Sequence, residues 1–388
     1  MSLQAPLDAL LQAGVADGSV AGVTTAVTSR DDTLYESGFG ERALGSGTVM
    51  TSNTVGWIAS MTKAITGVAA MQLVEQGKLD LDSPASTWAP YLGEVQVLEG
   101  FRDDGRPKLR APKQTITLRH LLTHTAGFGY ANWDESIRRY VEHEKLPASN
   151  SGDNRGLMTP LLFDPGERWL YSTAIDWAGK IVESVSGKKL GAYMTENILQ
   201  PLEMTSTSFR ISPDMRDRLA KIHRREDGAL TPTDTETPQN PPAEMGGGGL
   251  YSTAVDYLKF IRMILNEGTG NGNQVLKPET VRIMSRNQMG NCRVCRLPTT
   301  NSHVSLDAEF FPGMPKTWGL TFMINEEKAP TGRSAGSLAW AGLANSYYWI
   351  DPDKGIGGVY LTQILPFVDE RALSLYLGFE TAVYDNLN

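Results

Sequence analysis

Segments with strand character lie near the two ends of this chain, and their placement restricts the possible folds more than any other feature. Residues 20 to 39 contain two β-branched runs separated by the polar turn Arg30-Asp31-Asp32, a pattern typical of a hairpin. Aromatic and β-branched runs return at residues 318 to 324, 346 to 350 and 357 to 365. We therefore predict an α+β fold in which one antiparallel sheet, flanked by helices, is assembled from both ends of the chain.

The middle of the chain, between about residues 85 and 240, has helical rather than strand patterns, and it ends in a Pro-rich polar stretch. We expect residues 1–85 and 241–388 to form an α/β domain with the antiparallel sheet, and residues 86–240 to form an inserted, mainly helical domain. The cleft between them is the expected place for an active site. Over the whole chain, helices are expected at 60 to 76, 116 to 124, 134 to 145, 174 to 186, 253 to 266, 278 to 286 and 370 to 386.

Composition excludes several classes of function. The net charge is −8, with 36 Lys and Arg against 44 Asp and Glu, so nucleic acid is not an expected partner. The chain has no uninterrupted apolar run long enough to cross a membrane, and its N-terminus has neither the basic nor the apolar region of a leader peptide. We expect a cytoplasmic protein that does not associate with membranes.

Ser60 and Lys63 are the strongest candidates for catalysis. Three residues apart on a predicted helix, their side chains share one face, with about 5–6 Å between Cβ atoms. Among apolar neighbours such as Met61 and Ile65, the Lys63 amine loses solvation, which lowers its pKa toward that of a general base for the Ser60 hydroxyl. Alone, this S-x-x-K pattern also fits an N-cap serine followed by a solvated lysine, so its context decides.

Two further motifs supply that context: Tyr171-Ser172-Thr173, which follows F-D-P-G-E-R-W-L, and Trp340-Ala341-Gly342. With L-R-H-L-L-T-H-T-A-G-F (118 to 128) and G-G-G-G-L-Y-S-T-A-V-D (246 to 256), they extend over nearly the whole chain. The chain resembles the serine β-lactamase and penicillin-binding-protein superfamily. The resemblance is closest to the class C-like branch, which includes the family VIII carboxylesterases and related acyltransferases.

The resemblance implies a role for each motif. Ser60 would be the nucleophile, Lys63 the base and Tyr171 a proton relay, although Tyr171 also fits an interface tyrosine packed beside Trp169. The oxyanion hole would consist of the backbone N–H groups of Ser60 and Leu343. Substrate contacts would come from Thr173 and from Trp340, Ala341 and Gly342, and no metal or other cofactor is implied.

Two positions depart from the family pattern. Thr173 stands where class C enzymes have Asn, which removes an amide suited to gripping an amide substrate. Trp340 stands where they have Lys, which removes a cation suited to the carboxylate of a β-lactam. A neutral indole at this position suits an uncharged acyl or alkyl group, and the esterase branch carries the same Trp-x-Gly variant. Both departures favour ester substrates.

Other patterns compete weakly with this interpretation. Gly332-Arg333-Ser334-Ala335-Gly336 matches G-x-S-x-G, but a buried strand does not precede it and no histidine follows His303. The Gly246 to Gly249 run lacks the G-K-[ST] ending of a phosphate loop, and we expect it to let the chain pass close to the site.

Two histidines and two cysteines are candidate metal ligands. His120 and His124 are four residues apart, but without an H-E-x-x-H pattern or an obvious third ligand we expect hydrogen-bonded structural histidines. Cys292 and Cys295 are the only cysteines, with His303 the one nearby candidate as a further ligand, and we expect two reduced thiols in a surface loop.

We therefore predict a serine carboxylesterase that acts on small-molecule esters through an acyl-enzyme on Ser60, with water or an alcohol as acceptor. The alternatives are a β-lactamase or D-amino-acid peptidase or amidase with the same nucleophile, and a non-catalytic binding protein on this fold.

Overall fold

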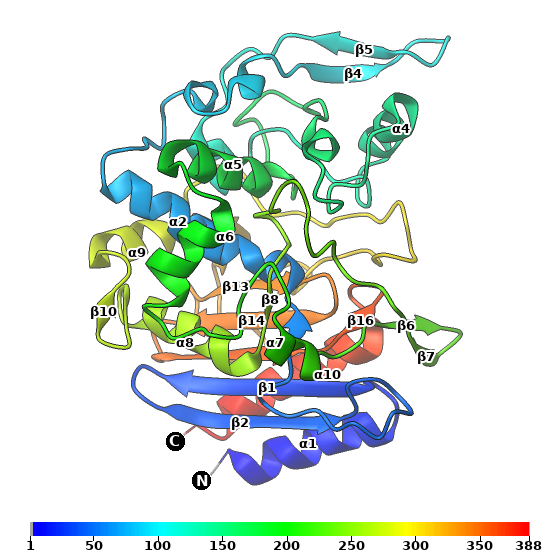
Figure 1. Cartoon of the computed structure of the whole chain (residues 1–388), viewed down its shortest axis with the longest axis vertical. Coiled ribbons are helices and arrows are strands. Elements are labelled where there is room, and N and C mark those ends of the chain that lie inside the picture. The colour runs from blue at the N-terminus through cyan, green and yellow to red at the C-terminus, as the bar shows by residue number, and fades with distance from the viewer. Residues whose placement is uncertain (1–2, 388) are drawn as a thin grey trace.

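A seven-stranded antiparallel sheet forms the centre of the computed structural model, which describes residues 3–387. Its strands come from both ends of the chain, as predicted, in the order β11-β12-β13-β14-β15-β1-β2 (Figure 1). The strands are β1 (Gly22–Ser29), β2 (Thr33–Gly40), β11 (Lys316–Trp318), β12 (Met323–Asn325), β13 (Leu338–Gly342), β14 (Ser346–Asp351) and β15 (Ile356–Leu361).

The predicted hairpin is β1–β2. Ser29 Oγ accepts hydrogen bonds from the backbone N–H groups of Asp31 and Asp32, which closes the turn between the strands. β1 is buried at nearly every position because β15 pairs with its other edge, whereas β2 is the exposed edge strand.

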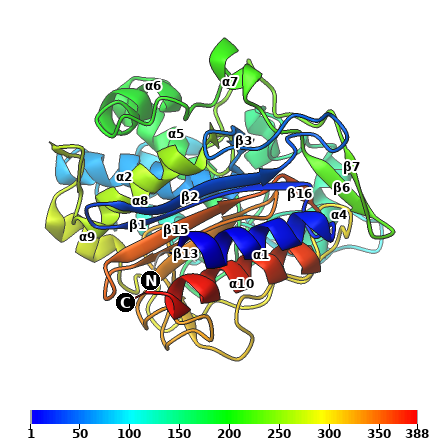
Figure 2. The same ribbon diagram turned by 90° about the horizontal axis from the view of Figure 1, so that it is seen from below.

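Helices cover both faces of the sheet. On one face, α1 (Gln4–Ala16) and α10 (Glu370–Asp385) lie side by side (Figure 2). A Cβ atom on Gly14 would lie 2.4 Å from Leu375 Cδ2, so glycine permits their close contact. On the other face, α8 (Ala254–Leu265) packs against β1 and β15, and its N-cap is Thr253, whose side chain accepts from the N–H of Asp256.

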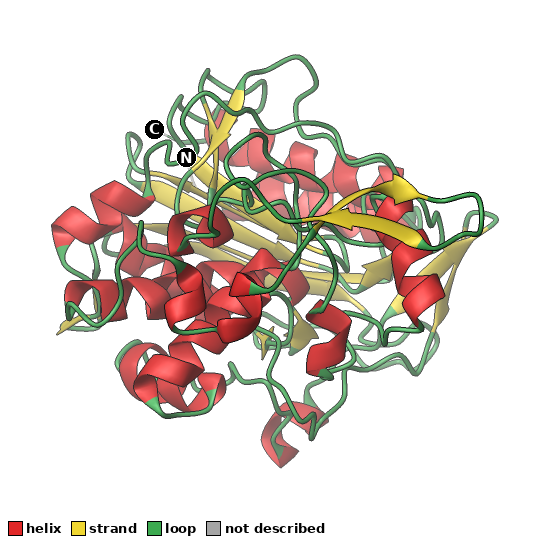
Figure 3. Ribbon diagram, turned by 90° about the horizontal axis from the view of Figure 1, so that it is seen from above, coloured by secondary structure: helices red, strands yellow, loops and turns green. Residues whose placement is uncertain are grey.

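The buried helix predicted at 60 to 76 is α2 (Thr62–Glu75), preceded by a 3-10 turn, η1 (Ala59–Met61). Gly77, just past its C-terminal end, has φ +66°, a conformation that glycine adopts without strain. α2 packs against α5 (Ala174–Ser186) of the middle part, and one buried cluster of side chains continues from the sheet into these helices. Figure 3 shows the helices lying against the sheet.

The middle part contains the predicted helices and also small strands that the sequence did not indicate. The helices between residues 86 and 240 are α3 (Leu118–Leu122), α4 (Glu135–Glu144), α5, α6 (Leu190–Met194), which continues as a π-helix (Thr195–Leu199), and α7 (Pro213–Asp217). The strands form the hairpins β4 (Val97–Phe101) with β5 (Pro107–Arg110) and β6 (His223–Glu226) with β7 (Ala229–Pro232). The domain boundaries at 85/86 and 240/241 stay a prediction.

Short strand pairs and one further helix complete the fold. They are β3 (Gly56–Trp57) with β8 (Tyr251–Ser252), β9 (Thr269–Gly270) with β10 (Asn273–Gln274), and α9 (Pro278–Met284).

Two runs predicted as single strands are each divided. Residues 318 to 324 contain the end of β11, a buried turn with Thr321 at φ +81°, and the start of β12. Residues 357 to 365 leave the sheet after Leu361, and β16 (Ile364–Leu365) then pairs with β6. The turns are as buried as the strands, so hydrophobicity alone did not reveal them.

Candidate active site

Ser60 lies in the 3-10 turn between β3 and α2. Ala59, just before it, has φ +43°, a strained conformation for a residue with a side chain and one found often at functional sites. β13 ends beside this turn, because Gly342 has no Cβ atom; one placed there would lie 2.3 Å from the carbonyl oxygen of Ile58. The end of β13 is thereby held against the candidate nucleophile.

Lys63 is buried, with 1% of its surface exposed, and its amine contacts three oxygens. Nζ donates to Ser60 Oγ at 3.1 Å, to the Tyr130 hydroxyl at 3.1 Å and to the Gly247 carbonyl oxygen at 2.6 Å. Burial lowers the pKa of Lys63 to about 7, while the nearby Asp176 carboxylate acts in the opposite direction. A neutral amine keeps one N–H for the Gly247 carbonyl, a second N–H for one hydroxyl and a lone pair for the other. This arrangement suits a base for Ser60.

The Gly246 to Gly249 run passes directly over α2, in agreement with the sequence interpretation. Thr66 Oγ1 donates to the Gly246 carbonyl at 2.7 Å, and Asp176 Oδ1 accepts from the Gly247 N–H at 2.8 Å. A Cβ atom on Gly247 would lie 2.4 Å from Asp176 Oδ2, so glycine is required for this approach. The loop therefore fixes the carbonyl that binds Lys63.

Asp176 is a residue that the sequence did not point out. It lies in the first turn of α5, 3% exposed, and burial raises its pKa while the Lys63 amine lowers it. Its partner Gly247 lies 71 residues away in the chain, so the sequence carried no local signal for the pair.

Tyr171 lies against the same amine from another side. Lys63 Nζ is 4.7 Å from the centroid of its ring, and its hydroxyl is hydrogen-bonded with the Ser60 side chain. The Trp340 indole N–H donates to this hydroxyl at 3.0 Å. Burial raises the pKa of Tyr171 above its usual value, so the phenol is protonated at neutral pH.

The expected role of Trp340 needs correction. The sequence interpretation placed the indole against the substrate, but in the structure it points into a buried aromatic cluster and bonds Tyr171. Trp340, Ala341 and Gly342 are absent from the described lining of the pocket, whereas Leu343, the next residue, belongs to it. In this structure the indole therefore serves as a partner of Tyr171 and does not form the pocket surface.

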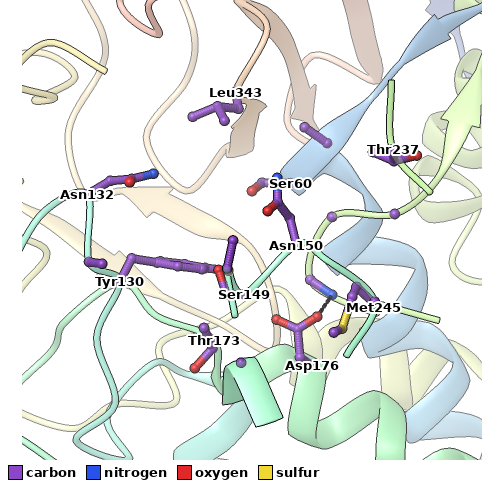
Figure 4. Close-up of a pocket in the computed structure, with 18 of the residues that line it drawn as sticks. Ser60, Tyr130, Asn132, Ser149, Asn150, Thr173, Asp176, Thr237, Met245 and Leu343 are labelled. Atoms are coloured by element: carbon purple, nitrogen blue, oxygen red, sulfur yellow. Dashed lines mark hydrogen bonds between the residues drawn. The ribbon is translucent and has the colours of Figure 1, made fainter. Parts of the chain in front are cut away.

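A pocket of about 310 Å³ opens beside Ser60. Ser60, Thr173 and Leu343 face it from three separate segments, and Tyr130 and Asn132 face it from a fourth (Figure 4). In the described part of the chain, Asp176 is the only charged residue of its lining. Apolar side chains on its wall are Trp57, Trp133, Ile137, Val141, Pro147, Phe209, Pro238, Pro241, Met245 and Val304. The pocket suits neutral, largely apolar groups.

Several polar groups at the pocket have no partner within residues 3–387. They are the backbone N–H groups of Ser60 and Leu343 and the Thr173 hydroxyl. The first two are the expected oxyanion-hole donors, and that role stays a prediction. Asn132, in which the side-chain amide also meets no partner in these residues, was missed by the sequence interpretation. Asn132 places a side-chain amide on the pocket wall, whereas Thr173, where class C enzymes have Asn, has none.

The two histidines and the serine of the G-x-S-x-G match make hydrogen bonds that stabilise the fold. His120 Nδ1 accepts from the Thr117 N–H and completes the N-cap of α3, and His124 is buried with Nδ1 bonded to the N–H of Ser172. Ser334 lies between β12 and β13, where its hydroxyl bonds Asp353.

Cys292 and Cys295 are free thiols near backbone carbonyls of Gly166 and Trp169. Within residues 3–387, no group of three or more His, Cys, Asp or Glu side chains is arranged to hold a metal ion. No helix in that range is long and apolar enough to cross a membrane.

Comparison with known proteins places the chain in a family. The beta-lactamase family model matches residues 7–382. Monacolin J acid methylbutanoyltransferase of Aspergillus terreus is 34% identical over 84% of this chain and 81% of that protein. Lovastatin esterase of Penicillium rubens is 31% identical over 97% of this chain and 98% of that protein.

A mutant of simvastatin synthase (LovD) from Aspergillus terreus superposes with a TM-score of 0.84 at 28% identity, covering 99% of this chain and 97% of that one. This chain belongs to the beta-lactamase family. More particularly, it is a serine enzyme of the acyltransferase and esterase type on the β-lactamase fold.

Proposed function

We propose that this protein is a carboxylesterase that transfers the acyl group of a neutral ester to Ser60 and then to water. The observation that carries this proposal is the buried Lys63 amine, bonded to Ser60 at 3.1 Å with its pKa lowered to about 7. Such an amine accepts the Ser60 proton near neutral pH, when an ordinary lysine does not.

The chemistry has two stages. Ser60 Oγ attacks the ester carbonyl carbon as Lys63 Nζ takes its proton, and the oxyanion is stabilised by the N–H groups of Ser60 and Leu343. The alcohol leaves with a proton, which leaves an acyl-enzyme on Ser60. Water then attacks the acyl carbon, its proton returns through Lys63 to Ser60 Oγ, and the acid departs.

The test is a burst of p-nitrophenol from a short-chain p-nitrophenyl ester, with the trapped acyl group located by intact-protein mass. Ser60→Ala is expected to lose the mass increment and to fall by at least about 10³-fold in turnover. Ser149→Ala is the matched control, because Ser149 lines the same pocket and should leave acylation intact. Full turnover by Ser60→Ala would end the proposal.

Acyl transfer to an alcohol is a second candidate, favoured by the relatives named above and by a pocket whose wall is largely apolar. The measurement is product partition: with an added alcohol, a transferase forms the new ester at the expense of the free acid, whereas a hydrolase forms the acid alone.

The amide-directed alternative is less supported, because the described pocket lining contains no Lys or Arg to bind a β-lactam carboxylate. Nitrocefin turnover equal to ester turnover would favour it instead.

A further inference from the structure

We propose that Tyr130 is a second catalytic tyrosine, which passes protons between Lys63 and the oxygen of the alcohol that leaves or enters the pocket. This inference rests on the ester chemistry proposed above at Ser60.

The contacts of the two tyrosines differ. The Tyr171 hydroxyl has two partners, the Trp340 indole and the Ser60 side chain, and Tyr171 is not among the described lining residues of the pocket. The Tyr130 hydroxyl accepts from Lys63 Nζ at 3.1 Å, the same distance as Ser60 Oγ, and Tyr130 lines the pocket. Of these two phenols, Tyr130 is therefore the one in reach of both the base and a bound alcohol.

The proton of Tyr130 is free to be donated. Its hydroxyl oxygen accepts from Lys63, and within residues 3–387 it meets no acceptor for its own O–H. In Figure 4 its side chain extends into the pocket from the same segment as Asn132, toward the region below Ser60. A phenol in this position has an unused donor directed to where an alcohol oxygen would depart.

The surrounding structure holds Tyr130 in place. Its ring packs against Tyr171 and Trp133, with centroids 5.4 and 5.7 Å away. The Trp133 indole N–H donates to Ser305 Oγ at 3.1 Å, and the Thr300 N–H donates to the Asn132 carbonyl at 2.9 Å. The 299 to 305 segment thus anchors this turn before α4, which favours catalysis by a preorganised group.

The proton balance closes without another reactant. Ser60 gives its proton to Lys63 as it bonds the acyl carbon. When the bond from that carbon to the alcohol oxygen breaks, the oxygen takes the Tyr130 proton, and the Tyr130 oxygen takes a proton from Lys63. One proton has moved from Ser60 to the alcohol, and Lys63 and Tyr130 are restored. The reverse sequence activates an alcohol or water that attacks the acyl-enzyme.

The two tyrosines therefore divide the work. Tyr171, fixed by Trp340, orients Ser60, and Tyr130 serves the alcohol. Burial, Asp176 and Tyr171 raise the pKa of Tyr130 well above its usual value, so its two proton transfers occur together rather than through a free phenolate.

The experiment compares two esters with the same acyl group, an ethyl ester and a p-nitrophenyl ester, by kcat/KM, which reports acylation alone. An ethoxide leaving group needs a proton, whereas p-nitrophenolate leaves without one. Tyr130→Phe is expected to lose about 10²–10⁴-fold on the ethyl ester and less than about 10-fold on the p-nitrophenyl ester. Tyr171→Phe is expected to lose activity on both, because it positions Ser60.

Tyr140→Phe, on α4 and outside the pocket lining, is the matched control and should change neither value. Equal loss on the two esters, or no loss, would overturn the role of Tyr130. That outcome is distinct from failure of the proposed function, in which the wild-type protein forms no acyl group on Ser60. A Tyr130→Phe protein that still acylates from the p-nitrophenyl ester is folded.

Discussion

On one side of Lys63 lies a closed aromatic wall, formed by Tyr171, Trp340, Trp318 and His124, and on the other side lies the pocket. The rings of the aromatic wall are buried, with centroids 4.7 Å apart for Tyr171–Trp340 and for Trp318–Trp340. The pocket side is formed by loops around Tyr130, Asn132 and the 237 to 249 segment.

The buried aromatic wall should therefore control the rate of the reaction, and the pocket loops its substrate specificity. The aromatic wall removes water from Lys63 and holds Tyr171, so changes there should alter kcat and its pH dependence. The loops contact whatever enters, so changes there, apart from those at Tyr130, should alter the choice of substrate. The predictions below test this division, beginning with the largest expected effect.

Lys63→Met should abolish most activity, since it removes the base and keeps the apolar volume. We expect kcat/KM for an activated ester to fall on the order of 10⁴-fold, at the upper end for loss of a general base. The unfolding temperature should be retained, because a buried amine costs solvation. Lys259→Met, which alters a lysine on α8 paired with Asp256, should keep wild-type kinetics. Activity within 10-fold of wild type would refute Lys63 as the base.

The pH profile should follow the Lys63 amine. Below its pKa of about 7 the amine is protonated and cannot accept the Ser60 proton, so kcat/KM should rise with pH through this value. Between pH 5 and the plateau we expect a change on the order of 100-fold.

Asp176→Asn should move the midpoint of this profile to lower pH, because the carboxylate favours the charged amine. Glu279→Gln, on the exposed surface of α9, should leave it in place. A midpoint that stays constant or rises in Asp176→Asn would show that the carboxylate does not act on Lys63.

Trp340→Phe tests the aromatic wall. It removes the N–H that donates to Tyr171 at 3.0 Å and keeps a ring. A lost hydrogen bond worth about 1 kcal/mol corresponds to roughly a 5- to 10-fold fall in kcat, with KM nearly unchanged because the indole does not line the pocket. Trp318→Phe is the matched control for the smaller ring, since its indole N–H has no partner in residues 3–387, and it should lower kcat less than Trp340→Phe does. A change mainly in KM would show instead that the Trp340 side chain contacts the substrate.

Val141→Phe tests the pocket side, and its effect should be confined to esters with bulky groups. Val141 lines the pocket, so the bulkier phenyl ring of phenylalanine should lower kcat/KM about 10-fold for esters with bulky groups. Acetate esters should be unaffected. Val141→Ala should shift the preference the other way, and equal effects on small and bulky esters would show that this wall does not select substrates.

Much of the fold was predictable from the sequence because its signals are local. The β1–β2 hairpin, α2, α5 and α10 each have a turn, an apolar periodicity or a terminal residue within their own segment. α1 was missed, although Leu7 and Leu11 mark its buried face. The divided strands were missed because the turns after β11 and β15 are buried like the strands themselves.

For the site, the sequence by itself determined the pair Ser60 and Lys63, because one helical turn fixes their approach whatever surrounds them. Only the tertiary structure decided that Tyr130 and Gly247 bond that amine and that the Asp176 carboxylate lies near it, since these residues come from segments far apart in the chain. It also decided that the Trp340 indole bonds Tyr171 and does not line the pocket. Successive side chains of a strand point to opposite faces of the sheet, and only the packed structure shows what lies against each face. The pKa of Lys63 follows from the same burial, which a sequence pattern indicates but only packing brings about.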